Sequence, residues 1–590
     1  MNTLNRRQAL RAGSLAAAGG VALAGGVTGA LGAPAAFQHG VASGDPLPDG
    51  VLLWTRLTPS ADAVPGSGRG RQQTVGWEIA HDPEFRRIAA RGRVGTGPER
   101  DHTVKVDATG LAADTWYYYR FTWRDSVSPV GRTRTAPARG SAVDLLRFGV
   151  VSCSDWQAGH FAAYRHLAER GDLDLVIHLG DYLYEYEADP DGVRPHDPPV
   201  EMVTLEHYRR RHAQYKTDPA LQALHAATPW VVTWDDHESA NDSWSGGAEN
   251  HTEPDEGPWS ERQAASQRAY AEWMPVRYEP GGHIYRRLEF GSLVELSMLD
   301  LRTYRSQQVS HPFDRGIHDD ERTITGRKQL EWLTSGLVTA TAQWKLIGNS
   351  VMISPAQFPS TLNTREFEAL TDLIGPIEGV PYNVDQWDGY THDRATVLRT
   401  LRDHGVSGTV FLTGDIHSGW ATELPADPLT YPLTGDSVAT ELVCTSVTSD
   451  NIDDYLRVPP RTLSLVVEAV LKLANPHVKY LDFDSHGFSV LEVTPEAVRM
   501  DWFRLADRTD PDSSAEVTAS YRVPAGTNKL ERAPRSLDGA TPRFEAATEA
   551  ERAEAERQAR ARQARETAPN TAARRDDAPS NEPAASREAS

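Results

Sequence analysis

The sequence predicts a mixed α/β fold, with a two-sheet core and outer helices, preceded by a smaller all-β domain. Two observations carry this prediction. Four short apolar runs of strand length end directly in clusters of polar residues, and stretches of helical character separate these runs. Residues 36–138, by contrast, hold only short aromatic and β-branched segments separated by Gly, Pro and Asp.

The first residues have the features of an export signal. Arg6 and Arg7 precede a Gly/Ala-rich apolar run from Ala16 to Leu31, and Ala33-Pro34-Ala35 resembles a cleavage site. The run is too short and too poor in large apolar residues for a good spanning helix, and no later run approaches that length. Residues 1–35 are therefore predicted to be a twin-arginine signal peptide. The twin-arginine translocation machinery is therefore an expected partner. The protein is expected to be secreted or to lie in the cell wall or periplasm.

Charge and cysteine content exclude several classes of protein. The net charge is −21, with 24% charged and 39% hydrophobic residues, which suits a globular chain and argues against nucleic acid as a partner. We expect a monomer without an integral membrane segment. Cys153 and Cys444 permit one disulfide by count, but no disulfide scaffold. Cys153, among polar residues, is predicted to be a ligand, and Cys444 a core thiol.

Residues 36–138 are predicted to form a β-sandwich domain, because short strands recur at the spacing of such folds. A boundary is expected at Pro137–Ser141, and a packing or shielding role is favoured over sugar or wall binding. The strands expected here begin near Val51, Thr74, His102 and Trp116.

Residues 139–522 are predicted to form the larger domain, in which four strands end in polar clusters. In a layered α/β fold the carboxyl ends of neighbouring strands converge on one edge, so these clusters are expected to meet there. The clusters are Ser152-Cys153-Ser154-Asp155, Gly180-Asp181-Tyr182-Leu183-Tyr184, Asp235-Asp236-His237-Glu238 with Asn241 and Asp242, and Gly414-Asp415-Ile416-His417.

Asp181 and Tyr184 suggest the chemistry of this edge. A carboxylate mounted at a strand end can bridge two cations, and a phenolate suits a hard ferric ion. Taken alone, the pattern fits slightly better with a turn in which Asp181 caps a helix and the tyrosines pack. The recurrence of polar clusters at four strand ends favours a metal site instead.

In combination these motifs resemble a known family. Gly180-Asp181-x-x-Tyr184, Asp235-Asp236-His237-Glu238 and Gly414-Asp415-x-His417 resemble the calcineurin-like metallophosphoesterases. Further segments narrow the resemblance to the PhoD-type alkaline phosphatases, over residues 37 to 522. These segments are His39–Pro46, Ser152–Asp155, Trp234–Asp242, Ser446–Asn451 and Ser485–Phe488.

The resemblance implies a phosphate-ester hydrolase that contains Fe³⁺ and Ca²⁺. It also implies an αββα-sandwich metallophosphoesterase core behind an immunoglobulin-like β-sandwich. Carried over by position, the iron ligands would be Cys153, Asp181, Tyr184 and His417, with Asp181 bridging the metals. Asp236 and Asp415 stand where related enzymes place asparagine and histidine, and Asn241 could bind metal or phosphate. Two additional carboxylates suit calcium, which prefers oxygen-rich sites, better than zinc.

The predicted mechanism follows from charge. Adjacent cations neutralise the phosphate oxygens and acidify a water, so a metal-held hydroxide or oxide is the expected nucleophile. His237 is predicted to orient groups or to act as an acid or base, with a purely structural role behind the ligands as the alternative. Arg209 is predicted to contact the substrate phosphate, against the alternative that the arginines at 209–211 lie on a solvated helix face.

Four further positions leave alternatives open. Asp155 is either a ligand or a helix cap. Asn349 is either a polar site residue or part of a turn. The aromatics of Asp385–Tyr390 either line the entrance or pack in a loop. His486 is either a ligand or a residue that supports the ligands from behind, and the supporting role is favoured.

After Val523 the composition changes. Residues 523–590 form an Ala/Glu/Arg-rich tail, which is predicted to be largely disordered because it lacks an apolar stripe. The tail carries no predicted catalytic residue.

The function predicted from these features is that of an exported alkaline phosphatase. One alternative is a phosphodiesterase or phospholipase D that acts on phospholipid or teichoic-acid diesters. Another is a catalytically inactive, wall-associated binding protein on the same fold. Every expected ligand position holds a competent residue, which favours an enzyme that acts on phosphate esters.

Overall fold

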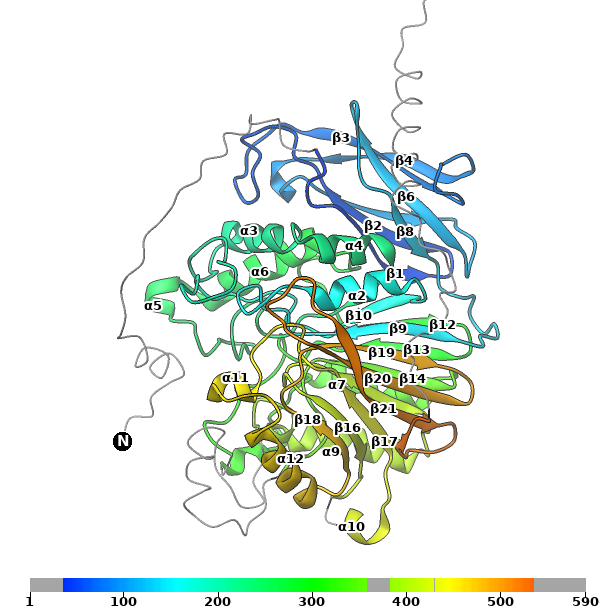
Figure 1. Cartoon of the computed structure of the whole chain (residues 1–590), viewed down its shortest axis with the longest axis vertical. Coiled ribbons are helices and arrows are strands. Elements are labelled where there is room, and N and C mark those ends of the chain that lie inside the picture. The colour runs from blue at the N-terminus through cyan, green and yellow to red at the C-terminus, as the bar shows by residue number, and fades with distance from the viewer. Residues whose placement is uncertain (1–35, 313, 358–382, 429, 535–590) are drawn as a thin grey trace, which may run out of the picture. The chain divides into compact units, whose positions relative to one another are not determined.

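The computed structural model describes residues 36–312, 314–357, 383–428 and 430–534 (Figure 1). The predicted signal peptide lies outside these residues, as does the tail from residue 535. No helix in the described parts is long and apolar enough to cross a membrane. Cys153 and Cys444 are both buried and both free, so the disulfide allowed by their number does not form.

A ten-stranded sheet contains three of the four strands that end in polar clusters. Strands β9, β10 and β11 are parallel neighbours at its centre, with Ile177 opposite both Val150 and Val231. Its strand order is β22 (Glu531–Arg532), β21 (Ala515–Pro524), β20 (Ala497–Leu505), β19 (Gly487–Val493), β9 (Leu146–Val151), β10 (Leu175–His178), β11 (Trp230–Val232), β1 (Val41–Leu47), β2 (Gly50–Arg56) and β5 (Thr103–Thr109). The sheet therefore continues past residue 523, where the tail was predicted to begin.

A seven-stranded sheet contains the fourth such strand, β15. Strands β13, β14, β15 and β17 are parallel, and antiparallel strands flank them. The order is β12 (Arg286–Phe290), β13 (Val294–Met298), β14 (Trp344–Asn349), β15 (Thr409–Thr413), β17 (Ala439–Val443), β16 (Gly419–Leu424) and β18 (Val478–Asp482).

The two sheets pack face to face, and helices cover their outer faces (Figure 1). One buried cluster joins Val150 and Ile177 of the larger sheet to Leu346 and Leu412 of the smaller sheet, and it includes Cys444, as predicted. The outer face of the larger sheet shares a cluster with α2 (Ala162–Arg170), α3 (Leu205–Tyr215), α4 (Pro219–Ala227) and α6 (Trp259–Trp273). The outer face of the smaller sheet packs against α7 (Arg327–Thr339) and α9 (Thr391–Asp403).

The N-terminal strands form a second sheet that packs on part of the first. This five-stranded sheet consists of β3 (Gln73–Ala80), β4 (Ile88–Thr96), β6 (Trp116–Trp123), β7 (Ser126–Val127) and β8 (Gly131–Arg134). Its apolar face, with Val75 and Phe121, buries Val51 and Leu53 of β2.

Strand β1 connects this N-terminal part to the larger sheet. Gly44 pairs in parallel with Trp230 of β11. A Cβ at position 44 would lie only 2.8 Å from the Trp230 carbonyl oxygen, so glycine permits this close approach. The predicted separate β domain thus shares a sheet with the rest of the chain. The sequence reading missed this connection because β1 contains Gly, Asp and Pro and lacks a regular alternation of apolar residues.

Candidate metal centre and active site

The polar clusters that follow β9, β10, β11 and β15 converge, as their positions at strand ends predicted. Their side chains provide three groups of metal-ligating residues, and in each group one donor atom per residue lies within 4.8 Å of the others. The groups are Cys153, Asp181 and His417; Asp181, Asp236 and His237; and Asp235, Asp236 and Asp415.

The first group surrounds a phenol. The Tyr184 hydroxyl lies 3.1 Å from Asp181 Oδ2 and 3.3 Å from His417 Nε2. The His417 Nδ1 atom lies 2.8 Å from the Asp450 carbonyl oxygen, so Nδ1 carries the proton and Nε2 is left as the lone-pair donor. The structure thus brings together the four residues that the family resemblance assigned to iron, including Cys153.

The backbone at these positions is unusual. Cys153, Asp181, Asp415 and His417 have φ values of 59°, 54°, 62° and 53°, in the left-handed region that residues with a Cβ rarely adopt. Each such residue costs of order 1 kcal/mol and persists where its surroundings hold it in place. Their concentration at four candidate ligands indicates that the strand-end loops are shaped to direct these side chains inward.

Gly180 explains how Asp181 comes so close to the neighbouring strand end. Its φ is +113°, and a Cβ there would lie 2.5 Å from Asp235 Cβ and 2.7 Å from the Asp235 backbone nitrogen. The Glu238 carboxylate then joins the two loops, because it accepts hydrogen bonds from the backbone N–H groups of Asp181 (3.1 Å), Tyr182 (2.7 Å) and Asp235 (2.8 Å).

Two aspartates are shared between the groups: Oδ1 of Asp181 is unpaired, and Oδ1 of Asp236 has only an ion pair with Arg302 Nη2 at 3.5 Å. Asp181 belongs to the first and second groups, and Asp236 to the second and third. The Oδ1 atoms of both are buried without a hydrogen-bond partner among the described residues. A buried, unpaired carboxylate oxygen is costly, and a cation would remove that cost. Asp181 is therefore placed to bridge two cations.

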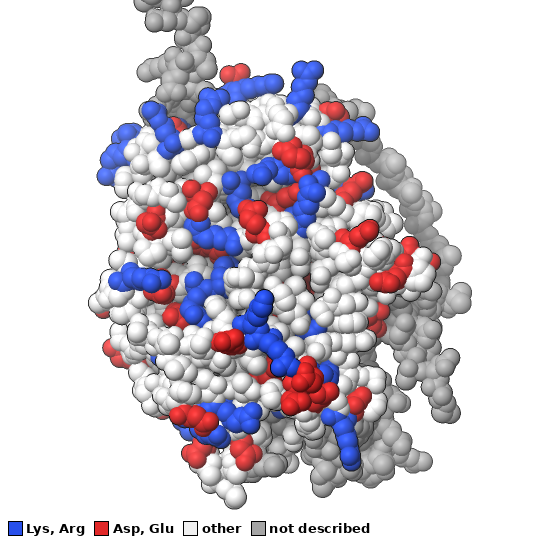
Figure 2. All heavy atoms as spheres, turned by 180° about the vertical axis from the view of Figure 1, so that it is seen from behind, with Lys and Arg blue, Asp and Glu red and all other residues white. Residues whose placement is uncertain are grey.

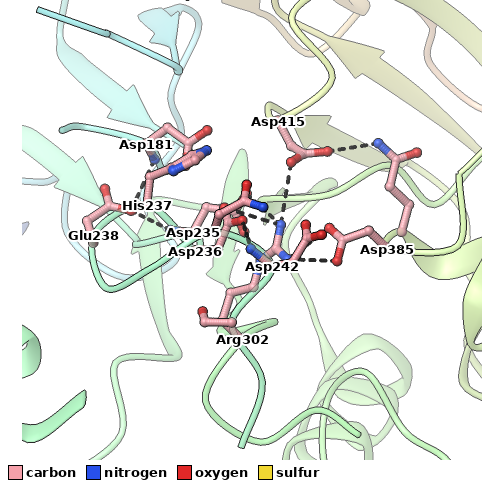
Figure 3. A network of polar contacts seen from close by, with 12 residues as sticks. Asp181, Asp235, Asp236, His237, Glu238, Asp242, Arg302, Asp385 and Asp415 are labelled. Atoms are coloured by element: carbon pink, nitrogen blue, oxygen red, sulfur yellow. Dashed lines mark hydrogen bonds and ion pairs between the residues drawn. The ribbon is translucent and has the colours of Figure 1, made fainter. Parts of the chain in front are cut away.

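Carboxyl groups dominate the centre. The labelled residues of Figure 3 are all acidic except His237 and Arg302. Burial, followed by repulsion from neighbouring carboxylates, raises the pKa values of Asp181 and Asp415 well above their usual range. Burial also raises the pKa of Glu238 to about 7. Because the protein's own cations balance only part of this charge, the centre suits bound metal ions.

His237 is oriented from behind by a carboxylate. Its Nδ1 atom lies 2.7 Å from Glu185 Oε2, and Glu185 is completely buried. Burial alone would lower the pKa of His237, but Glu185, Asp236 and Asp181 together raise it well above the usual value. The sequence analysis did not identify Glu185, which lies next to Tyr184. The imidazole also belongs to a candidate metal group, a placement that the prediction of an acid–base or orienting role did not include.

Arg302 is the principal residue that the sequence analysis missed. Figure 3 shows its guanidinium among the carboxylates: Nε donates to Asp235 Oδ1 at 2.5 Å and Nη1 to Asp385 Oδ2 at 2.8 Å, while Nη2 lies 3.4 Å from Asp415 Oδ1. It follows β13 by a few residues. The sequence pattern that could have identified Arg302 is the same as at the other four strands: an apolar run that ends in polar residues.

Arg209, predicted to contact substrate, makes other contacts. Its Nε and Nη2 atoms each donate to the Glu272 carboxylate at 2.7 Å, and Nη2 also donates to the Glu99 carbonyl oxygen at 3.0 Å. It therefore ties α3 to α6 and to the N-terminal part. Its side chain is 6% exposed, so the alternative of a solvated face is wrong for this residue. None of its described contacts is with the candidate centre.

Arg211 supports the centre indirectly. It is buried, and its guanidinium donates to the carbonyl oxygens of Tyr184, Tyr186 and Pro198. These bonds fix the backbone of the loop that carries the Tyr184 phenol. The solvated-face alternative is therefore wrong for Arg211 as well.

Asn241 lies in the loop after β11. Its backbone N–H donates to Glu185 at 2.8 Å and its Nδ2 donates to Glu249 at 2.6 Å. These bonds orient the side-chain amide and leave its oxygen as the atom suited to a cation.

The positions with open alternatives have structural contacts. Asp155 accepts the Gln157 N–H at 2.8 Å in a local turn and does not cap α2, which begins at Ala162. Asn349 bonds Thr413 and the Trp387 indole, so it braces the end of β14. His486 bonds Ser446 and Asp454, outside the three groups.

The loop from Asp385 to Tyr390 packs in the interior. Trp387 is fully buried and Tyr390 is 1% exposed, so these aromatics do not line an entrance. Asp385 instead faces the centre through its bonds to Arg302 and Arg305.

The donor set fits the metals that the family resemblance implies. The first group, with the adjacent Tyr184, offers carboxylate, phenol, imidazole and thiol, which suit a transition metal such as iron. The third offers only carboxylate oxygens, which suit calcium, and Arg302 lies against all three of its members. Asp415 and His417 are half-buried, and the other ligand candidates are buried, so solvent reaches the centre on that side.

Comparison with known proteins gives a consistent picture. A family described as PhoD-like phosphatase matches residues 148–502, and its N-terminal domain matches residues 24–137. The chain is 35% identical to alkaline phosphatase D of Bacillus subtilis (strain 168) over 550 residues, or 88% of each chain. The solved structure of PhoD superimposes with a TM-score of 0.75 at 32% identity, covering 90% of this chain and 99% of that one.

Proposed function

The chain belongs to the PhoD-like phosphatase family, and we propose that the carboxylate-rich centre is the active site of an exported, metal-dependent alkaline phosphatase. Family membership makes the protein a phosphoric ester hydrolase. The two packed sheets with their outer helices would be its αββα metallophosphoesterase core. The N-terminal strands would be its immunoglobulin-like β-sandwich.

The proposed metals are Fe³⁺ and Ca²⁺. Cys153, Asp181, Tyr184 and His417 would hold iron, and Asp236, Asn241 and Asp415 would hold calcium. The observation that carries this assignment is the position of Asp181, which is shared by two ligand groups and has a buried, unpaired Oδ1 atom. A thiol and a phenol beside it suit iron, and the oxygen-only third group suits calcium.

The position of each residue in the centre indicates its proposed role in catalysis. Bound cations supply neutralisation of the phosphate oxygens and acidification of a water. His237, which Glu185 contacts through Nδ1, would move a proton at its other ring nitrogen, towards or away from the ester. Arg302 holds Asp235 and Asp415 in position, and Glu238 fixes the backbone that carries Asp181 and Asp235.

Export through the twin-arginine pathway is part of the proposal. It rests on Arg6, Arg7 and the apolar run after them, all of which lie outside the described residues. If Arg6→Lys combined with Arg7→Lys leaves secretion unchanged in cell fractionation, this part of the proposal is wrong.

A chelation experiment tests the proposed chemistry. Hydrolysis of a chromogenic monoester at alkaline pH should stop after treatment with a calcium-selective chelator and return with Ca²⁺, but not with Zn²⁺ or Mg²⁺. Full activity after exhaustive chelation contradicts a calcium requirement. The same preparation, assayed with a chromogenic diester and with phosphatidylcholine, distinguishes the phosphatase from the phosphodiesterase and phospholipase alternatives. Inactivity on all three substrates supports the binding-protein alternative.

A further inference from the structure

Helix α12 (Leu463–Ala474) has an unusual distribution of side chains. Leu463, Leu465, Val466 and Leu473 are 43%, 43%, 60% and 86% exposed, although each is a large apolar residue. Its polar residues Ser464 and Glu468, by contrast, are only 2% and 3% exposed. Figure 1 shows the helix at the lower edge of the molecule, next to β18.

The buried polar residues are fully engaged. The Ser464 hydroxyl donates to the Asp484 carboxylate. Glu468 accepts from the Phe483 backbone N–H at 3.1 Å and from Arg461 at 2.8 Å. Val467 and Leu471 pack between them against Leu481. These contacts fix which face of α12 is turned inward, and Leu463, Leu465, Val466 and Leu473 are therefore held on the outward face.

A surface helix usually turns its apolar residues inward and its polar residues outward. Helix α12 buries Val467 and Leu471 in this way, but it also carries large apolar residues on its outward face. Isolated apolar residues on a surface are ordinary, but four on one face of a single helix form a continuous patch. Removing such a patch from water lowers the free energy when the patch meets another apolar phase.

The charge around the patch indicates what that phase is. The stretch 456–479 contains four basic residues, Arg457, Arg461, Lys472 and Lys479, and one acidic residue, the buried Glu468. Arg461 is paired with Glu468 and Asp482, which leaves Arg457, Lys472 and Lys479 as the bases beside the patch. The chain as a whole has a net charge of −21. On the face shown in Figure 2, acidic and basic side chains are interspersed, whereas this stretch exposes no acid. Apolar residues flanked by bases are the pattern of a helix that lies in the interface of an anionic membrane.

We propose that α12 docks this enzyme on an anionic lipid surface, with Leu465, Val466 and Leu473 entering the apolar layer and Arg457 and Lys472 facing the headgroups. The same part of the chain leads to the candidate centre, since Asp450, just before α11 (Ile452–Leu456), bonds His417. Docking here would hold the enzyme at a membrane whichever ester it hydrolyses. The inference thus goes beyond the proposed function and does not depend on it.

A fluorescent label on a Leu473→Cys variant of the full chain tests insertion at this position. Cys153 and Cys444 are completely buried, so the label attaches to the introduced thiol. With vesicles that contain phosphatidylglycerol, the emission of an environment-sensitive label should shift to shorter wavelength, and with phosphatidylcholine alone the shift should be smaller. The same label on a Val64→Cys variant, on a 52% exposed residue of the N-terminal part, should not shift.

A matched pair of substitutions tests how much the exposed face of α12 contributes to membrane binding. Val466→Asp should weaken binding to phosphatidylglycerol vesicles in flotation by at least about tenfold, since it places a charge in the apolar layer. Val64→Asp should leave binding within about twofold of wild type. Both variants should hydrolyse a soluble chromogenic ester as wild type does, which shows that they fold. All variants share residues 1–35, so differences between positions report on α12.

Three results would overturn the proposal. One is an unshifted label on the Leu473→Cys variant in the presence of phosphatidylglycerol vesicles. Another is equal vesicle binding by the two aspartate variants. The third is a dimer in sedimentation velocity that Val466→Asp dissociates without lipid, because a second copy would then be the partner of this face.

Discussion

Tyr184 and Cys153 give the candidate centre its most specific chemistry at the scale of single residues. Burial, and then the nearby Asp181 carboxylate, raises the pKa values of both groups well above their usual range. Neither would ionise at such a place without a cation. Their presence beside Asp181, the proposed bridging carboxylate, therefore supports the proposed ferric iron, a metal that favours phenolate and thiolate donors.

Light absorption tests this pair directly. A phenolate bound to ferric iron transfers charge to the metal on excitation, so the purified protein should be coloured and should bleach on reduction. Tyr184→Phe should shift or remove most of the visible band, and Cys153→Ser a smaller part. Tyr182→Phe, a buried tyrosine that bonds His225, is the control and should leave the band unchanged. A colourless, iron-free and active protein would require another metal.

Arg209 is a residue for which sequence and structure lead to opposite expectations. Its bonds to Glu272 predict that Arg209→Ala lowers the free energy of unfolding by about 1–2 kcal/mol, because the half-buried Glu272 carboxylate loses a two-point partner and retains its bond to Arg268. The Michaelis constant for a chromogenic ester should stay unchanged. Arg210→Ala, at a side chain that is 33% exposed, should cost less than about 0.5 kcal/mol in the same urea titration.

A raised Michaelis constant for Arg209→Ala, with Arg210→Ala unaffected, would restore the predicted role in substrate binding. Unchanged stability would show that the Glu272 pair contributes nothing measurable. Either result would contradict the contacts described for Arg209.

At the scale of elements, the centre depends on how closely the loop after β10 approaches the loop after β11. Gly180 permits this approach, and Glu238 locks it with three backbone hydrogen bonds. A substitution in this turn should therefore disturb the metal site by moving Asp181 and Asp235, and not by removing a ligand atom.

Gly180→Ala tests the approach of these loops. The new Cβ would lie within 2.7 Å of the Asp235 backbone, so we expect a loss of at least about 3 kcal/mol in stability together with lost metal and activity. Gly257→Ala is the matched control. Its φ is +81° but the added Cβ meets nothing within 4 Å, so it should cost only about 1 kcal/mol and leave activity intact. Equal effects of the two substitutions would mean that backbone strain alone, and not the contact with Asp235, limits position 180.

The elements also show how much the sequence can predict. An apolar run followed by polar residues is a local pattern, so the convergence of Cys153, Asp181 and Asp236 could be expected from neighbouring strands. Asp415 follows β15 of the other sheet, and it joins them because the two sheets pack face to face. The partners of Arg209 could not, because Glu272 lies 63 positions away and on a different helix. The pairing of β1 with β11 was missed for a related reason: it has a single register pair, Gly44 with Trp230, which leaves no period in the sequence.

At the scale of the whole molecule, the interior holds basic groups that remain uncharged. His178, at the end of β10, is completely buried, with its Nε2 atom 3.2 Å from the Tyr164 hydroxyl. Burial, with a smaller contribution from Lys216, lowers its pKa to about 3. In the unfolded chain the same imidazole titrates near about 6.5. Above that pH both states are neutral; as the pH falls from about 6.5 towards 3, only the unfolded state binds the proton.

The folded state should therefore lose stability in this pH window, by about 1.4 kcal/mol per pH unit for this group. His178→Phe should reduce the slope of unfolding free energy against pH by one proton, measured by urea titration from pH 7 to pH 4. Val150→Ala, a buried substitution without a titrating group, should lower stability equally at every pH. A slope that is unchanged in His178→Phe would mean that other groups govern acid unfolding.

The central claim, that Asp181 bridges two metals in the active site, is tested most directly by the metal content of Asp181→Asn. The control is Asp393→Asn, an isosteric change at an aspartate that is 2% exposed and bonds Thr323 and Thr325 away from the centre. Elemental analysis should find iron and calcium in wild type and in Asp393→Asn. In Asp181→Asn both metals should be depleted, and activity on a chromogenic ester should fall by about a hundredfold or more. Full iron and calcium content with unchanged activity in Asp181→Asn would contradict the claim.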